Sequence, residues 1–297
     1  MRPFLPVSNG RCGRWRDRRQ VIDGILQRVR TGVQWRDLPE RFGPWKTVYE
    51  RHRLRSADGT WERLLQQVQA AADAEGEIDW DISVDSTIVR AHQHAAGART
   101  EPPPAFASKG AEGPEHQGET AWQSLLARLV EVVQEVRDWA ARGGGFTSKL
   151  HLSADGRCRP LSFVVTAGQR ADCTQFQTVL AKIRVPRTGS GRPRTKPDSI
   201  AADKAYSNGS CREYLRCRGI RHTIPEKTDS QAARLRKGSR GGRPPGFDEE
   251  RYKKRNTVEQ AINRLKQSRA VATRYDKRGY IILGTATTAA LLIWLRS

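Results

Sequence analysis

Residues 78–85 alternate strictly between apolar and polar side chains, a pattern that few backbone conformations accommodate. The apolar set is Ile78, Trp80, Ile82 and Val84, and the polar set is Asp79, Asp81, Ser83 and Asp85. A period of two predicts a β-strand with one buried face and one polar face. We therefore expect the chain to build a sheet around this strand.

Further strands and helices are predicted after this strand in alternating order. Strands at 146–152 and 161–166 flank the turn Asp155-Gly156, which is typical of a β-hairpin. A helix capped by Asp172, a strand at 199–202, a helix near 211–217 and a strand near 222–225 follow. Strand, hairpin, helix, strand, helix, strand and helix is an α/β order that predicts a mixed sheet.

The segment 14–75 is expected to be entirely helical, with short helices broken by Gly43 and Pro44. This pattern resembles a helix-turn-helix, in which the basic helix carrying Lys46, Arg51 and Arg53 would lie along a DNA groove. The alternative is a small helical bundle that packs on the rest of the chain. We predict a helical DNA-binding domain at 1–75 and a catalytic α/β domain at 76–297.

Several other segments have a distinct pattern. A loop and an amphipathic helix, which would cover the sheet or form a dimer contact, are predicted as an insertion at 95–145. Basic loops are expected at 184–196 and 227–245, and a long helix from Asp248 to about Arg269. The apolar stretch 280–295 falls short of the ~20 residues that cross a bilayer, so we expect a buried helix and no membrane.

The chain is strongly basic, with 53 Lys and Arg against 32 Asp and Glu and a net charge of +21. Such a surplus attracts polyanions, and it recurs along the whole chain, which favours nucleic acid over a membrane surface or mere solubility. The N-terminus lacks an apolar signal core, and the five cysteines form no Cys-x-x-Cys pair. Reduced cysteines in the cytoplasm fit best.

Two aspartates are candidate metal ligands. Asp85 lies toward the end of the first strand and Asp203 directly follows the strand at 199–202. Ligands collect at strand ends in α/β sheets, and two neighbouring acids repel unless a cation lies between them. The alternatives are a solvent-facing position for Asp85 and a cap or turn position for Asp203.

A third acid, Glu259, lies on the predicted long helix. Tyr252, Arg255, Glu259 and Lys266 fall within roughly 60° of one another at ~100° per residue, beside the apolar stripe of Val258, Ile262 and Leu265. Glu259 would then face the sheet, while Arg255 and Lys266 neutralise phosphates. The alternative is a solvated helix with i,i+4 ion pairs.

The spacing Tyr252-x2-Arg255-x3-Glu259-x6-Lys266 is similar to the signature of bacterial insertion-sequence transposases of the DDE, ribonuclease-H-like superfamily. The surroundings of Asp85 and Asp203 resemble that family's first and second acids. The segment Trp35-Arg36-Asp37-Leu38-Pro39, followed by Phe42-Gly43, also resembles the family. The resemblance extends from about Asp17 to Leu295.

This resemblance implies that Asp85, Asp203 and Glu259 hold two Mg²⁺ or Mn²⁺ ions. It also implies cleavage and strand transfer on double-stranded DNA, at terminal inverted repeats and at target DNA, by a homodimer in the bacterial cytoplasm. The DNA contacts would include Tyr252, Arg255, Lys266 and Lys204. The alternatives are an inactive, repressor-like DNA-binding copy and a ribonuclease-H-like nuclease that cuts without joining.

Overall fold

The computed structural model describes residues 17–92, 95 and 147–296. Its N-terminal region contains the helices α1 (Arg18–Thr31), α2 (Trp45–Ala57) and α3 (Thr60–Ala74), with two short 3₁₀ turns, η2 (Trp35–Asp37) and η3 (Glu40–Phe42), before α2. Asp17 caps α1 by accepting from the Arg19 N–H at 2.9 Å, and Gly32 ends it in the left-handed conformation. The apolar face of α1 is buried at Val21, Ile25 and Val29.

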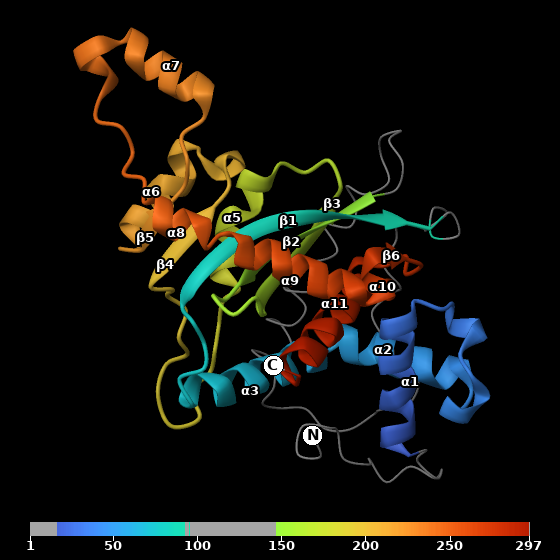
Figure 1. Cartoon of the computed structure of the whole chain (residues 1–297). Helices are drawn as coiled ribbons and strands as arrows, with labels where there is room; N and C mark the ends of the chain where they lie inside the picture. The colour runs from blue at the N-terminus through green and yellow to red at the C-terminus, as the bar shows by residue number, and fades with distance from the viewer. Residues whose placement is uncertain (1–16, 93–94, 96–146, 297) are drawn as a thin grey trace, which may run out of the picture.

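A six-stranded mixed sheet follows in the order β3-β2-β1-β4-β5, with β6 paired to β1 (Figure 1). The strands are β1 (Asp81–Ala91), β2 (Thr147–Ala154), β3 (Pro160–Ala167), β4 (Ser199–Ala202), β5 (Arg221–Thr223) and β6 (Thr273–Arg274). The pairs β1–β2 and β2–β3 are antiparallel, whereas β1–β4, β4–β5 and β1–β6 are parallel. The buried residues Ile82 and Val84 of β1 thus lie near the centre of the sheet.

Helices cover both faces of the sheet. On one face lies α5 (Asp172–Ala181), where the Ser162 hydroxyl of β3 donates to the Val179 carbonyl at 2.8 Å. On the other face lies α9 (Asn256–Gln267), where the Thr257 hydroxyl donates to the Ser83 hydroxyl of β1 at 3.2 Å. The remaining elements are η5 (Lys204–Tyr206), α6 (Gly209–Cys217), α7 (Thr228–Arg236), η6 (Gly238–Gly241), α8 (Glu249–Lys253), α10 (Arg269–Ala272) and α11 (Gly279–Trp294).

The C-terminal segment joins the N-terminal helices to the sheet. The buried Asp276 accepts from the Trp35 indole at 3.1 Å and pairs with Arg28 at 3.4 Å. His52 of α2 and Thr285 of α11 form a hydrogen bond of 3.1 Å between the ring Nε2 and the hydroxyl. At the other end of α11, the Trp294 indole donates to the Pro160 carbonyl at 2.7 Å. One continuous core therefore contains residues of α1–α3, the sheet and α11.

The close approach of α2 and α11 requires a glycine. A Cβ placed on Gly284 would lie 2.0 Å from the Ser56 hydroxyl and 2.6 Å from its Cβ. Any larger side chain at this position would push the two helices apart.

The predicted order of helices and strands is confirmed, with a helical N-terminal region followed by a mixed sheet with helices. The strand at 199–202 and the buried helix at 280–295 are found within one residue of their predicted limits. The predicted insertion at 95–145 lies almost wholly outside the described residues.

Four local predictions were wrong. The first strand begins at Asp81 and continues to Ala91, because β2 pairs with it as far as Arg90. The expected loop at 227–245 contains α7 and η6. Asp172 is the first residue of α5, and its carboxylate binds the side chains of Ser86 and Lys149 instead of capping the helix. The long helix from Asp248 is divided into α8 and α9 by a turn at Lys254 and Arg255.

In the part of the chain that the structure describes, no helix is both long enough and apolar enough to span a membrane.

We predict that acid weakens the junction of α2 and α11 through His52. Burial lowers the pKa of His52 from 6.5 to about 4, so the unfolded chain binds a proton there more readily than the folded chain. The free energy of unfolding should therefore fall as the pH drops from about 6.5 to about 4, by roughly 1.4 kcal/mol per pKa unit at most. Urea denaturation of wild type and His52→Gln measures this fall. An identical pH dependence in both proteins would contradict it.

Candidate active site

The parallel pairing of β1 with β4 brings two of the predicted acids together. Val84 pairs with Ala202 at the end of this ladder, so Asp85 and Asp203, one residue further on, are neighbours at the carboxyl edge of β4. Their side chains share one face of the sheet because parallel neighbours in register point the same way. The neighbouring N–H group of Ser86 donates to Asp85 at 2.8 Å, and that of Lys204 donates to Asp203 at 2.6 Å.

Helix α9 brings the third acid over the same face. Ser83, two residues before Asp85 on β1, contacts Thr257 in the first turn of α9. The Arg255 guanidinium, just before α9, donates to Asp85 at 3.3 Å and also pairs with Glu259. A single arginine thus joins the first and third acids.

The charges of this group are strongly coupled. Burial raises the pKa of Asp85, the Ser86 N–H and Arg255 oppose this rise, and the negative charges of Asp203 and Glu259 add to it. Burial lowers the pKa of Arg255, but Glu259, Asp85 and Asp203 outweigh burial and leave it raised. The site therefore favours a positive charge among its carboxylates.

No three Asp, Glu, His or Cys side chains within residues 17–92, 95 and 147–296 are arranged to hold a metal ion. The Arg255 guanidinium occupies the space between Asp85 and Glu259. The chemistry of the donors fits Mg²⁺ or Mn²⁺, which prefer carboxylate oxygens. The Glu259 side chain is 46% exposed, so it is free to turn once Arg255 leaves.

The remaining predicted DNA contacts near the acids come from α8, α9 and the residue after Asp203. Tyr252 belongs to α8, where the Arg255 guanidinium lies 5.8 Å from its ring. Lys266 lies seven residues beyond Glu259 on α9, about 10 Å along the same face. Lys204 is exposed directly after Asp203. Lys204 thus lies beside the second acid, and Lys266 lies further along the helix that carries the third.

The predicted DNA contacts on α2 differ in their surroundings. Lys46 is exposed and Arg51 is half-buried. Arg53 pairs with Glu50 at 2.7 Å, and its side chain is only 14% exposed. Because Arg53 already has a carboxylate partner, Lys46 is the most accessible of the three cations.

A polar network behind Asp85 was missed by the sequence analysis. On the opposite face of β1, the Ser86 hydroxyl donates to Asp172 at 2.7 Å, and Lys149 of β2 pairs with Asp172 at 2.9 Å. The buried His151 lies 3.6 Å from the same carboxylate. The alternation of Lys149 and His151 along β2 was the signal that could have placed them on one face with Ser86.

Arg251 was missed as well. Its guanidinium donates to the Ser199 hydroxyl at 2.6 Å and to the Ile82 carbonyl at 3.1 Å, so α8 is fixed to both β1 and β4.

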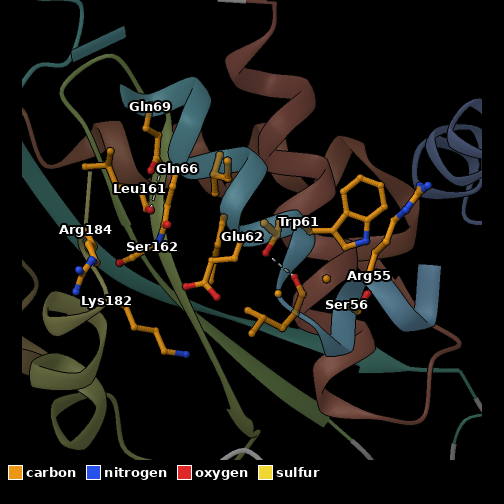
Figure 2. Close-up of a pocket in the computed structure, with 16 residues that line it drawn as sticks. Arg55, Ser56, Trp61, Glu62, Gln66, Gln69, Leu161, Ser162, Lys182 and Arg184 are labelled. Carbon is orange, nitrogen blue, oxygen red and sulfur yellow. Dashed lines mark hydrogen bonds between the residues drawn. The ribbon is translucent and has the colours of Figure 1, made fainter. Parts of the chain in front are cut away.

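A separate cavity of about 50 Å³ lies between α3, β3 and α11 (Figure 2). Gln69 of α3 lines it and donates to the Leu161 carbonyl at 3.1 Å, and Glu62 and Ser162 also line it. This volume is large enough for a few water molecules, and none of the predicted site residues lines it. The cluster of Asp85, Asp203 and Glu259 at the β1–β4 edge is therefore the candidate active site.

A helical region followed by a mixed sheet of this order, with helices on both faces, is the architecture of ribonuclease-H-like domains. The family model "Transposase DDE domain" matches residues 78–281, and the model "Putative transposase of IS4/5 family" matches residues 1–65. The chain belongs to the transposase DDE domain family. Members of this family generally use divalent metals.

Three relatives match about a third of the chain each. The "Uncharacterized protein y4sN" of Sinorhizobium fredii is 40% identical over 100 residues, which is 33% of this chain and 76% of the relative. The "Insertion element IS402 uncharacterized 16.2 kDa protein" of Burkholderia cepacia is 39% identical over 90 residues, 29% of this chain and 55% of the relative. The "Putative transposase for insertion sequence element IS402" of the same organism is 30% identical over 90 residues, 30% of this chain and 43% of the relative. The chain thus spans only about half of the two IS402 proteins, and no solved structure matches it.

Proposed function

We propose that the protein is a transposase that cuts the ends of an insertion sequence and joins them to target DNA. The observation that carries this proposal is the register of β1 and β4. It sets Asp85 beside Asp203, while Arg255 links Asp85 to Glu259 on α9. Carboxylates from three distant parts of the chain, brought to one edge of the sheet, are a donor set that suits the divalent ions of phosphodiester chemistry.

Asp85, Asp203 and Glu259 would hold two Mg²⁺ or Mn²⁺ ions. When bound, such ions supply the positive charge that activates an attacking oxygen and stabilises a leaving one. The chain's own contribution is to orient these carboxylates. The Ser86 and Lys204 N–H groups hold one oxygen of each aspartate, and this leaves the second oxygen of Asp203 available to a ligand.

Arg255 has a different role with and without DNA. In the described structure it neutralises Asp85 and Glu259. With metal ions held by these carboxylates, the guanidinium would be available to a DNA phosphate, together with Lys204, Lys266 and the Tyr252 hydroxyl. Arginine suits this exchange because it stays charged in both situations.

The reaction would proceed in two steps on one site. Water would first hydrolyse the phosphodiester at the end of the element and free a 3′-hydroxyl. This hydroxyl would then attack a phosphodiester of the target DNA, form a new P–O bond and displace the 3′-oxygen of the target strand as the leaving group. Terminal inverted repeats would be bound by the N-terminal helices, with Lys46 and Arg51 of α2 against phosphates. A homodimer would hold the two ends of the element together.

We predict that Asp85→Asn, Asp203→Asn and Glu259→Gln each reduce cleavage of a terminal-repeat duplex in Mn²⁺ by at least about 10³-fold, since each removes a charge that holds the ions. Duplex binding in a gel shift should change little. Asp23→Asn, an exposed acid of α1, is the charge-matched control and should cut normally. Wild type that binds the duplex but never nicks it would favour the repressor-like alternative. Nicking without joining of a pre-cleaved end would favour the simple nuclease.

We also predict that Arg255→Gln binds Mn²⁺ about two- to tenfold more tightly than wild type, because the arginine competes with the ions for Asp85 and Glu259. Cleavage should nevertheless fall, since the phosphate loses its cation. Titration calorimetry with Mn²⁺ alone measures the first effect, and Arg255→Lys, which keeps the charge, is the control. Weaker Mn²⁺ binding by the Gln variant would show that Arg255 supports the site and does not compete for it.

A further inference from the structure

Residues 226–248, between β5 and α8, form an extension that we name the basic arm. It contains α7 and η6, and none of its residues is buried. In Figure 1, α7 stands clear of the sheet and is joined to it by two connecting stretches of chain. Leu235 in the middle of the arm is 64% exposed. Hydrophobic burial therefore does not explain why this segment is ordered.

The cations of the basic arm are not neutralised by the protein. Its exposed basic residues are Lys227, Arg236, Lys237, Arg240 and Arg243. Across the described residues, the structure gives ion pairs to none of these five; Arg234, in contrast, pairs with Glu226 at 3.0 Å. An array of unpaired cations on a protruding element is suited to a polyanion.

Internal contacts give the arm a defined shape. The Arg234–Glu226 pair ties α7 to the start of the arm. At the far end, η6 folds back so closely that a Cβ on Gly241 would lie 2.1 Å from the Arg234 carbonyl oxygen. These contacts restrict the shape of the arm, and such restriction lowers the entropic cost of binding.

Both ends of the basic arm are attached next to the candidate active site. It leaves from β5, whose last residue Thr223 pairs with Ala201, two residues before Asp203. It returns into α8, which Arg251 fixes to Ile82 of β1 and Ser199 of β4. A duplex with one phosphodiester among the acids would therefore extend along the arm.

We propose that the basic arm binds the phosphate backbone of the duplex that flanks the scissile bond, without reading its sequence. This inference rests on the proposed function and adds to it the surface that holds the flank. The partner is duplex DNA because its phosphates are regularly spaced over the length of the arm. The cations Arg236 and Lys237 at the end of α7, Arg240 in η6 and Arg243 just after η6 make the contacts.

The test replaces these four cations by Gln in the full chain and measures duplex affinity as a function of salt. Each lost phosphate contact reduces the slope of log K against log salt by about 0.9, so we expect a slope smaller by about 2–4. Affinity at ~0.1 M salt should fall about 10- to 100-fold for a long flank. A duplex that ends at the cleavage site should bind both proteins equally, and circular dichroism should show an unchanged fold.

The matched control removes the same charge from the opposite end of the sheet. Arg184, Arg187, Arg192 and Lys196 are exposed in the segment that leads into the amino end of β4, and their replacement by Gln should leave the slope nearly intact. An equal loss in both variants would mean that only net charge matters, and an unchanged slope in the arm variant would mean that DNA does not touch the arm. Either result overturns the proposal.

The salt slope does not depend on cutting, so the arm and the proposed function can fail separately. If wild type binds duplex without nicking it, the transposase proposal is contradicted, and the salt slope still tests DNA binding by the arm. If wild type nicks DNA but the arm variant has an unchanged salt slope, only the proposed role of the arm is contradicted. Loss of self-association in the arm variant, with unchanged DNA binding, would identify a protein partner instead and would also overturn the proposal.

Discussion

The parallel ladder between β1 and β4 determines where the candidate catalytic aspartates of this protein lie. It joins segments more than a hundred residues apart, and its register is fixed because Ile82, Val84, Ile200 and Ala202 are completely buried. A slip of one residue would move Asp85 to the face that packs against α5 and would expose Val84. Each aspartate comes directly after the last buried residue of its strand in this ladder. Apolar packing on one face thus positions two negative charges on the other, and repulsion between them is the cost of that arrangement.

The chain reduces this repulsion with its own cation. Arg255 lies at the turn between α8 and α9, where Lys254 and Arg255 keep helical backbone angles but the bonds shorten to i→i+3 contacts. A continuous helix would carry Arg255 and Glu259 on one rigid face, whereas the turn lets the arginine reach across to β1. The chain thereby supplies a positive charge of its own to Asp85 and Glu259. Opposite Asp85, Asp172 and Lys149 fix Ser86, so the strand is held from both sides of the sheet.

Much of this fold was predictable from the sequence, and the failures have physical causes. The strand at 199–202 was found because a short apolar run stands between Asp198 and Asp203, and the edge location of Asp85 and Asp203 followed from that pattern. The break at Lys254 was invisible because neither Gly nor Pro marks it. Helix α7 lacks an apolar face altogether, so periodicity gave no signal. The role of Asp172 depends on Lys149 and Ser86, which are distant in sequence, and only tertiary structure brings them together.

The close packing of α11 against α2 also affects how the chain is made. Of the described elements, α11 is the last to leave the ribosome. His52, however, forms a hydrogen bond with Thr285 of α11, and Trp35 and Arg28 bind Asp276 in the segment just before it. Until then the apolar faces of α1–α3 lack a partner and are open to chaperones and proteases. A message shortened before codon 276 would therefore yield a product defective at both ends, in its first helices as well as its last. Premature termination in such a gene would seldom leave a stable fragment that competes with the intact protein.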